Sequence, residues 1–173
     1  MQWLICHGNI LDVKADALVC SANVQLNMSG GVGGEILVRH GDQMQKELHR
    51  YLSERGISYV APGTVVKTSP CGTSFSVVLH AVAINVFYET SHELIVSTTR
   101  HALKICSEHG IESVALTALA TGYGRYPIDK YALVLTELQK EKFPNIKDIS
   151  ICLRNKDDAD ELMSFLDKQC YRG

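Results

Sequence analysis

The sequence has no long hydrophobic run and no closely spaced cysteine pair. No apolar stretch approaches the ~20 residues of a membrane-spanning helix, and the N-terminus lacks a basic segment followed by an apolar one. The six cysteines are scattered without a CxxC pair, which argues against a zinc site or a disulfide framework. The sequence therefore predicts a soluble, intracellular protein with reduced thiols, no metal and no membrane contact. We expect it in the cytoplasm, with the nucleus as an alternative.

The sequence also lacks a large excess of positive or negative charge. The formal net charge is −2 over 173 residues, and the lysines and arginines are scattered instead of forming a stripe. This distribution disfavours a nucleic-acid partner, which normally requires a clustered positive surface. There is no internal repeat, low-complexity segment or Gly/Ser-rich linker, and 46% of the residues are hydrophobic. We therefore expect one domain over residues 1–173, present as a monomer.

Apolar runs rich in β-branched residues alternate with helical patterns along the chain. The runs predict about six strands, at residues 3–6, 17–21, 64–68, 75–82, 113–119 and 149–153. The helical patterns lie at residues 33–40, 42–55, 91–109, 127–142 and 157–169. This alternation predicts an α/β fold, a three-layer α/β/α sandwich around a mixed, mostly parallel sheet. The strand order stays open at this point.

Two glycine clusters follow directly after two of these predicted strands. The first contains Gly30, Gly31, Val32, Gly33 and Gly34, and the second contains Ala120, Thr121, Gly122, Tyr123 and Gly124. Because glycine lacks a Cβ atom, backbone N–H groups can approach an anion closely, and a helix that starts there adds partial positive charge. Ligands of open α/β sheets lie at the carboxyl ends of the strands, where both clusters fall. We interpret the clusters as two loops that bind one diphosphate, although flexible turns are the simpler alternative.

Several polar residues near these loops have two interpretations. The amide of Asn23 could face a sugar hydroxyl or cap a turn. Thr121 offers a hydroxyl group, while Tyr123, Arg125 and Tyr126 could form the wall of a sugar site or pair with phosphate. The alternative is that the tyrosines pack over the loop and that Arg125 is a solvated surface charge.

Other titratable residues are expected to be structural. His80 lies within an apolar strand pattern, which is typical of a hydrogen-bonded core histidine. Cys20 and Cys152 lie within strands and should be packing thiols. The acidic run at residues 157–161 suits the first turn of a helix, where carboxylates complement the helix dipole.

Several short segments form a recognisable series along the chain: Gly8–Ile10, Asp16–Val19 with Ala22-Asn23, Gly30–Gly34, Leu79–Val82, and Ser113–Leu116 leading to Ala120–Gly124 and Tyr126-Pro127. Taken in this order, they resemble the macro domain family, which binds ADP-ribose. The resemblance covers nearly the whole chain. It implies that Asn9 and Ile10 face the adenine, that Asn23 faces the distal ribose, and that both glycine loops hold the diphosphate. Ala22, next to Asn23, is counted among the ligand contacts.

The sequence departs from the family pattern at positions that matter for activity. Many family hydrolases carry an aspartate where this chain has Gly33, and the family's adenine-reading aspartate is replaced by Asn9. Cys20 replaces the first asparagine of the usual Asn-Ala-Ala-Asn stretch. No aromatic residue for the adenine follows the last strand, where the guanidinium plane of Arg154 could stack instead.

The resemblance therefore implies a module that binds free or protein-linked ADP-ribose without any cofactor. The alternative is an enzyme that removes ADP-ribose from modified proteins or deacylates O-acyl-ADP-ribose. In such an enzyme, the attacking water would be held by the phosphate of the substrate and by the loop backbone, and Asn23 is the candidate catalytic residue. A weaker alternative is a module for RNA or another nucleotide.

Overall fold

Six strands form one mixed sheet in the computed structural model, which describes residues 1–170 and the side chains of residues 1–166. The strands are β1 (Gln2–His7), β2 (Ala17–Ser21), β3 (Val65–Thr68), β4 (Val77–Ala81), β5 (Ser113–Thr117) and β6 (Asp148–Leu153). Their order across the sheet is β1-β6-β5-β2-β4-β3. All neighbouring strands are parallel except β3, which runs antiparallel to β4 at one edge. The predicted mixed, mostly parallel sheet is confirmed.

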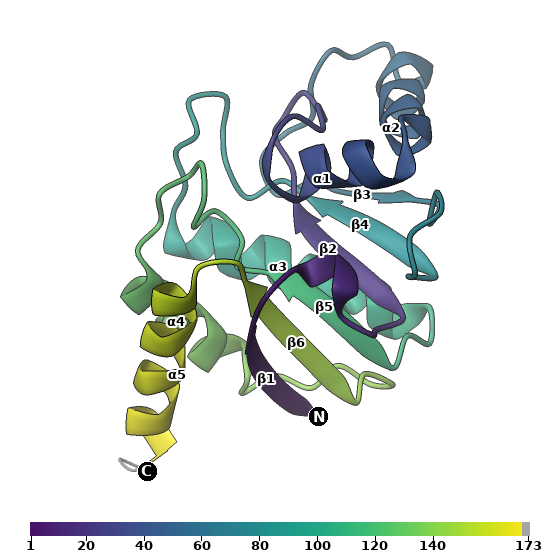
Figure 1. Cartoon of the computed structure of the whole chain (residues 1–173). Helices are drawn as coiled ribbons and strands as arrows, with labels where there is room; N and C mark the ends of the chain where they lie inside the picture. Colours follow the sequence, from purple (N-terminus) through teal and green to yellow (C-terminus); the bar gives the residue numbers. More distant parts are fainter. Residues whose placement is uncertain (171–173) are drawn as a thin grey trace.

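Helices cover both faces of this sheet (Figure 1). They are α1 (Gly31–His40), α2 (Gln43–Glu54), α3 (His92–Glu108), α4 (Ile128–Leu138) and α5 (Lys156–Cys170), with a 3₁₀ turn η1 (Ile10–Asp12) after β1. Side chains of α1 and α2 share one hydrophobic core with the sheet, and side chains of α3, α4 and α5 share the other. The structure therefore has the predicted α/β/α layers.

Successive side chains of β2 point to opposite faces of the sheet, so this one strand contributes to both hydrophobic cores. Ala17 and Val19 belong to the core under α3, α4 and α5, whereas Leu18 and Cys20 belong to the core under α1 and α2. All four side chains are almost fully buried, which a central strand covered on both faces requires. This accounts for the unbroken apolar run in the sequence.

The element boundaries agree with the sequence prediction to within two residues except at the end of α4, and two of the differences have a clear structural cause. The helix predicted to reach residue 142 ends at Leu138, and β5 ends at Thr117 instead of residue 119. After Leu138 the chain forms tight turns and then places Phe143 and Ile146 in the core, which a continued helix would not allow. After Thr117 the backbone leaves the sheet and reaches a left-handed residue, Ala120, with a φ of +64°.

The buried His80 is a hydrogen-bonded core residue, as predicted. It lies on β4, is 2% exposed, and has its Nε2 atom 3.1 Å from the Thr68 hydroxyl and its Nδ1 atom 3.6 Å from the Cys20 thiol. Burial lowers the pKa of His80 to about 4 and raises the pKa of Cys20 to about 12. Burial likewise raises the pKa of Cys152 to about 12, so neither thiol is activated at neutral pH.

The five cysteines whose side chains are described are free thiols, and the side chain of Cys170 lies outside the described residues. Among residues 1–170, no helix is both long and apolar enough to cross a lipid bilayer.

Protonation of His80 should destabilise the protein in mild acid. The unfolded chain binds this proton near pH 6.5 and the folded protein only near pH 4, so acid favours unfolding across that window. The free energy of unfolding should fall by about 3 kcal/mol between these pH values because of this residue. Urea titrations at several pH values should show a shallower pH dependence for His80→Gln than for the wild type. Replacement of the exposed His7 by Gln is the control, and an equal effect of both substitutions would contradict the prediction.

Candidate ligand-binding cleft

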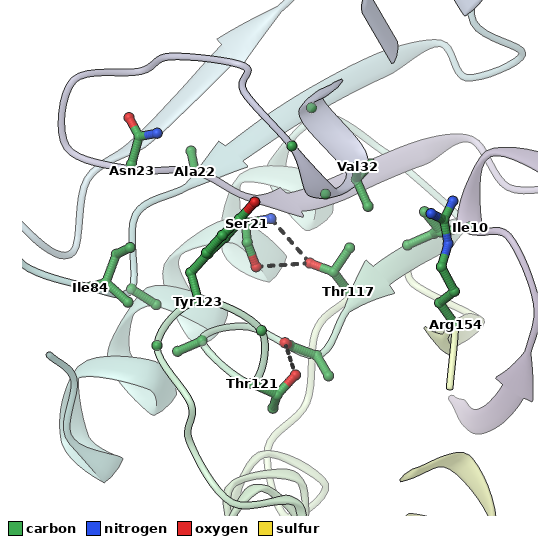
Figure 2. Close-up of a pocket in the computed structure, with 18 of the residues that line it drawn as sticks. Ile10, Ser21, Ala22, Asn23, Val32, Ile84, Thr117, Thr121, Tyr123 and Arg154 are labelled. Carbon is green, nitrogen blue, oxygen red and sulfur yellow. Dashed lines mark hydrogen bonds between the residues drawn. The ribbon is translucent and has the colours of Figure 1, made fainter. Parts of the chain in front are cut away.

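A cleft of about 700 Å³ opens at the carboxyl edge of the sheet. Residues at or just after the ends of β1, β2, β4, β5 and β6 line it, because these parallel strands all end at the same edge. Figure 2 shows Asn23, Ala22 and Ile84 toward one end of the cleft, and Ile10 and Arg154 toward the other. The cleft is large enough for an elongated small molecule.

The N-terminus of α1 forms one wall of the cleft. Gly30 is its N-cap with a φ of +77°, and the first helical hydrogen bond runs from the Gly34 N–H group to the Gly30 carbonyl at 2.8 Å. The N–H groups of Gly31, Val32 and Gly33 precede that bond, and these residues line the cleft. The positive end of the helix dipole lies at the same place, so this wall favours an anion.

The loop after β5 forms the opposite wall and is closed by its own hydrogen bonds. The Tyr126 N–H group donates to the Ala120 carbonyl and the Arg125 N–H group to the Gly122 carbonyl, both at 3.0 Å. The residues between these bonds, Gly122, Tyr123 and Gly124, line the cleft. A Cβ atom at Gly124 would lie 2.6 Å from the Ala120 carbonyl oxygen, so the loop requires glycine there. The result is a second glycine-containing turn, closed by hydrogen bonds, that faces α1.

Tyr123 connects the two walls. Its side chain extends from the loop after β5 toward the first loop, as Figure 2 shows. A Cβ atom at Gly30 would overlap the Tyr123 hydroxyl, so the phenol lies directly against this glycine. Tyr123 remains 66% exposed although it lines the cleft, so it lies at the outer margin of the space between the loops. A ligand between the loops would therefore lie beneath Tyr123.

Two hydroxyl groups that the sequence did not single out lie between these walls. The Ser21 N–H group donates to the Thr117 Oγ1 atom at 3.1 Å, and the two hydroxyl oxygens are 3.3 Å apart (Figure 2). Both residues end strands, and both line the cleft. Ser21 ends a predicted strand, which was its sequence signal, whereas Thr117 lay inside the strand predicted to reach residue 119 and had no such signal.

Asn23 lines the cleft, but its amide is bonded within its own turn. Its Nδ2 atom donates to the Asn27 carbonyl at 2.9 Å, and its Oδ1 atom accepts from the Asn27 N–H group at 3.0 Å. His49 of α2 approaches the same turn, with its Nε2 atom 3.1 Å from Asn27 Oδ1. The arrangement matches the turn-capping interpretation of Asn23.

At the other end of the cleft, Glu35 organises two of the predicted ligand contacts. Its carboxylate accepts hydrogen bonds from Asn9 Nδ2 and from the Arg154 guanidinium, and Arg39 lies 2.8 Å away. Partial burial opposes its ionisation, but the Asn9 hydrogen bond and the charge of Arg154 lower the pKa of Glu35. The Asn9 Oδ1 atom accepts from the Leu11 N–H group at 3.0 Å. A flipped amide would place Oδ1 against the Glu35 carboxylate, so the orientation of Asn9 is determined.

The structure brings together all the predicted contact residues except three. Gly34 lies on α1 and Tyr126 packs against the core, both outside the lining of the cleft. Arg125 lines a smaller neighbouring cavity. As ligand contacts, the residues that do line the cleft remain predictions.

Carboxylates are scarce in the cleft. Among the described residues that line it, Asp158 is the one acidic residue, and it belongs to the first turn of α5, which follows β6. The end near Asn23 and Ile84 therefore has no carboxylate in its lining. The described side chains also contain no cluster of histidine, cysteine or acidic residues that could hold a metal ion.

Two adjacent glycines of α1 should respond differently to alanine. A Cβ atom at Gly34 would meet nothing closer than 3.7 Å, so Gly34→Ala should stabilise the helix by about 0.5–1 kcal/mol. A Cβ atom at Gly33 would lie 3.1 Å from Met28 Cα, and Met28 is held by a 2.7 Å hydrogen bond from its N–H group to Gln45. Gly33→Ala should therefore lower the free energy of unfolding in urea titrations. Equal stabilisation by both substitutions would contradict the prediction, because it would show that the backbone at Met28 moves away from a Cβ atom at position 33 without cost.

Comparison with known proteins shows which family this chain resembles in sequence and fold. The family model of the Macro domain matches residues 19–135. An uncharacterised protein of Saccharolobus solfataricus is 31% identical over 165 residues, covering 95% of this chain and 92% of that protein. The Oceanobacillus iheyensis macrodomain with ADP has a TM-score of 0.84 at 22% identity, covering 98% of this chain and 92% of that one. The Trypanosoma brucei macrodomain in complex with ADP-ribose has a TM-score of 0.76 at 18% identity, covering 97% and 68%. By its family match and its relatives, this chain belongs to the Macro domain family.

Proposed function

We propose that the protein binds ADP-ribose, free or attached to protein, with the diphosphate between its two glycine loops. The observation that carries the proposal is that two glycine-containing stretches of main chain, Gly31–Gly33 at the start of α1 and Gly122–Gly124 in the loop after β5, line one cleft. Main-chain amides of this kind bind phosphate oxygens without any charged side chain. The ADP and ADP-ribose present in structures of similar fold support the same assignment.

The shape of the cleft suggests the direction of the bound nucleotide. The adenine would lie at the end formed by Ile10, Asn9 and Arg154, where an apolar side chain and a guanidinium plane are available. The distal ribose would lie at the end formed by Ala22 and Asn23. This orientation places the diphosphate between the loops.

The distribution of acidic groups favours binding over hydrolysis. Hydrolysis would need a group that activates water near the distal ribose, but Gly33 has no side chain and no lining carboxylate lies at that end. An aspartate at position 33 would have to displace the Met28 backbone. Asn23, the catalytic candidate, would have to leave its two hydrogen bonds with Asn27. The proposed function is therefore that of a reader.

Blocking the second loop should abolish binding. Gly122 lines the cleft, and a Cβ atom there meets no protein atom within 4 Å, so Gly122→Glu should fold normally while placing a negative charge where the diphosphate binds. Titration calorimetry should show ADP-ribose binding to the wild type and a loss of at least about 100-fold in the variant.

The matched control for this experiment is Gly34→Ala, which lies on α1 outside the cleft and should bind ADP-ribose as the wild type does. A folded wild type that gives no heat at high micromolar ADP-ribose would refute the proposed function. Release of ADP-ribose from a modified peptide by the wild type, but not by Gly122→Glu, would instead establish the hydrolase alternative.

The Asn9–Glu35 pair should relax selectivity for the base. The Asn9 amide keeps both a free acceptor position and a free donor hydrogen, so it can pair with the amino group of adenine or with the oxo group of hypoxanthine. ADP and IDP should therefore bind with similar affinity. Combining Asn9→Asp with Glu35→Gln supplies a lone carboxylate, which should favour ADP by about tenfold. Asn9→Asp alone is the control, because its carboxylate would face Glu35 and should reduce stability. If the double variant binds ADP and IDP with the same relative affinity as the wild type, Asn9 does not face the base.

A further inference from the structure

An exposed aromatic surface adjoins the cleft on the side of Ile84 and Tyr123. We call Phe87, Tyr88 and Tyr123 the aromatic rim; their exposed fractions are 77%, 45% and 66%. The rim lines a second cavity of about 480 Å³ together with Gly122, Gly124 and Arg125. Four of these residues, Tyr88, Gly122, Tyr123 and Gly124, also line the main cleft, so the two cavities adjoin each other. Clustered exposed aromatic side chains commonly mark a binding surface.

The backbone holds the rim in a defined shape. The segments after β4 and β5, which carry it, lie beside each other in Figure 1, and the Tyr88 and Tyr123 ring centroids are 6.0 Å apart. The Asn85 Oδ1 atom accepts from the Phe87 N–H group at 2.8 Å and from the Glu89 N–H group at 3.0 Å.

Two residues around the second cavity adopt strained backbone conformations. Tyr88 and Arg125 have φ values of +62° and +50°, in the left-handed region that side chains of this size rarely adopt. The Tyr88 N–H group donates to the Asn85 carbonyl, and the Arg125 N–H group to the Gly122 carbonyl, each at 3.0 Å. Strain maintained by such local hydrogen bonds is typical of binding loops. The rim is therefore preorganised before any partner arrives.

The charges around the rim select one class of partner. Within residues 84–94 and 118–130, the lysines and arginines are Arg125 and Lys130, against the carboxylates Glu89, Glu93 and Asp129. A polyanion such as an ADP-ribose polymer or a nucleic acid needs a surplus of positive charge, which these segments lack. A polypeptide with an apolar side chain suits an aromatic cavity in whose described lining Arg125 is the one charged residue.

We propose that the aromatic rim binds the polypeptide to which ADP-ribose is attached, with an apolar side chain near the modified residue in the second cavity. This inference rests on the proposed function, because the distal ribose must lie beside the rim. The protein would thereby bind a modified polypeptide in preference to free ADP-ribose. Contacts between the rim and the polypeptide would make the modified polypeptide bind more tightly than free ADP-ribose.

The test uses calorimetry of the intact protein with free ADP-ribose and two short peptides. Each peptide carries ADP-ribose on one serine; in one, leucines flank that serine, and in the other, glycines and serines do. The wild type should bind the leucine-flanked peptide at least about fivefold more tightly than free ADP-ribose. Phe87→Ser should lose this gain and keep the affinity for free ADP-ribose, because Phe87 lines only the second cavity.

Tyr59→Ser is the matched control, since Tyr59 is an exposed aromatic residue, 62% accessible, outside both cavities. It should leave every affinity unchanged, and thermal unfolding should show that both variants are folded. Equal affinities for the two peptides, or no effect of Phe87→Ser, would overturn the inference while leaving the proposed function intact. Tighter binding of an ADP-ribose dimer than of the leucine-flanked peptide would overturn it in favour of a polymer. A wild type that binds neither free nor peptide-linked ADP-ribose would refute the proposed function itself.

Discussion

The parallel pairing of β2 with β5 is the constraint on which the candidate site depends. Val19 pairs with Leu116, so the two strands end side by side at the carboxyl edge of the sheet. The first glycine loop follows β2 and the second follows β5, although about 90 positions separate Gly30 from Ala120 in the sequence. The Ser21–Thr117 contact joins the strands where they diverge into these loops. Any change in strand order would place the two sets of N–H groups in different parts of the molecule.

The candidate diphosphate site is built from main chain, and this explains its residue composition. An N–H group can face an anion only where side chains do not intervene, which accounts for the small residues on both walls. It also means that the proposed anion contact does not depend on ionisable side chains. The polar side chains of the cleft serve mainly to hold the backbone in shape, as Asn23 does through Asn27 and Asn9 through Leu11.

Long-range contacts modify the roles that individual residues suggested in the sequence. The family resemblance presented Asn9 only as a residue facing the adenine, but 26 positions separate it from Glu35, the carboxylate that orients its amide. Glu35 had no signal of its own, because a charged residue in the first turns of a helix is ordinarily solvated. Likewise, the exposed aromatic residues after β4 gained significance only beside Tyr123. Such pairings join segments that no local pattern connects.

The sequence by itself determined which segments are strands and helices. It also determined that glycine-rich loops follow two of the buried strands. It did so because hydrophobic periodicity and turn residues act locally. Boundaries such as the end of α4 depended on where Phe143 could reach the core, which is a tertiary property. Only the tertiary structure decided the strand order, the contact of Tyr123 with Gly30, and the network of Asn9, Glu35 and Arg154. These features depend on distances between segments remote in the chain, and such distances are set by packing the whole sheet between its two helical layers.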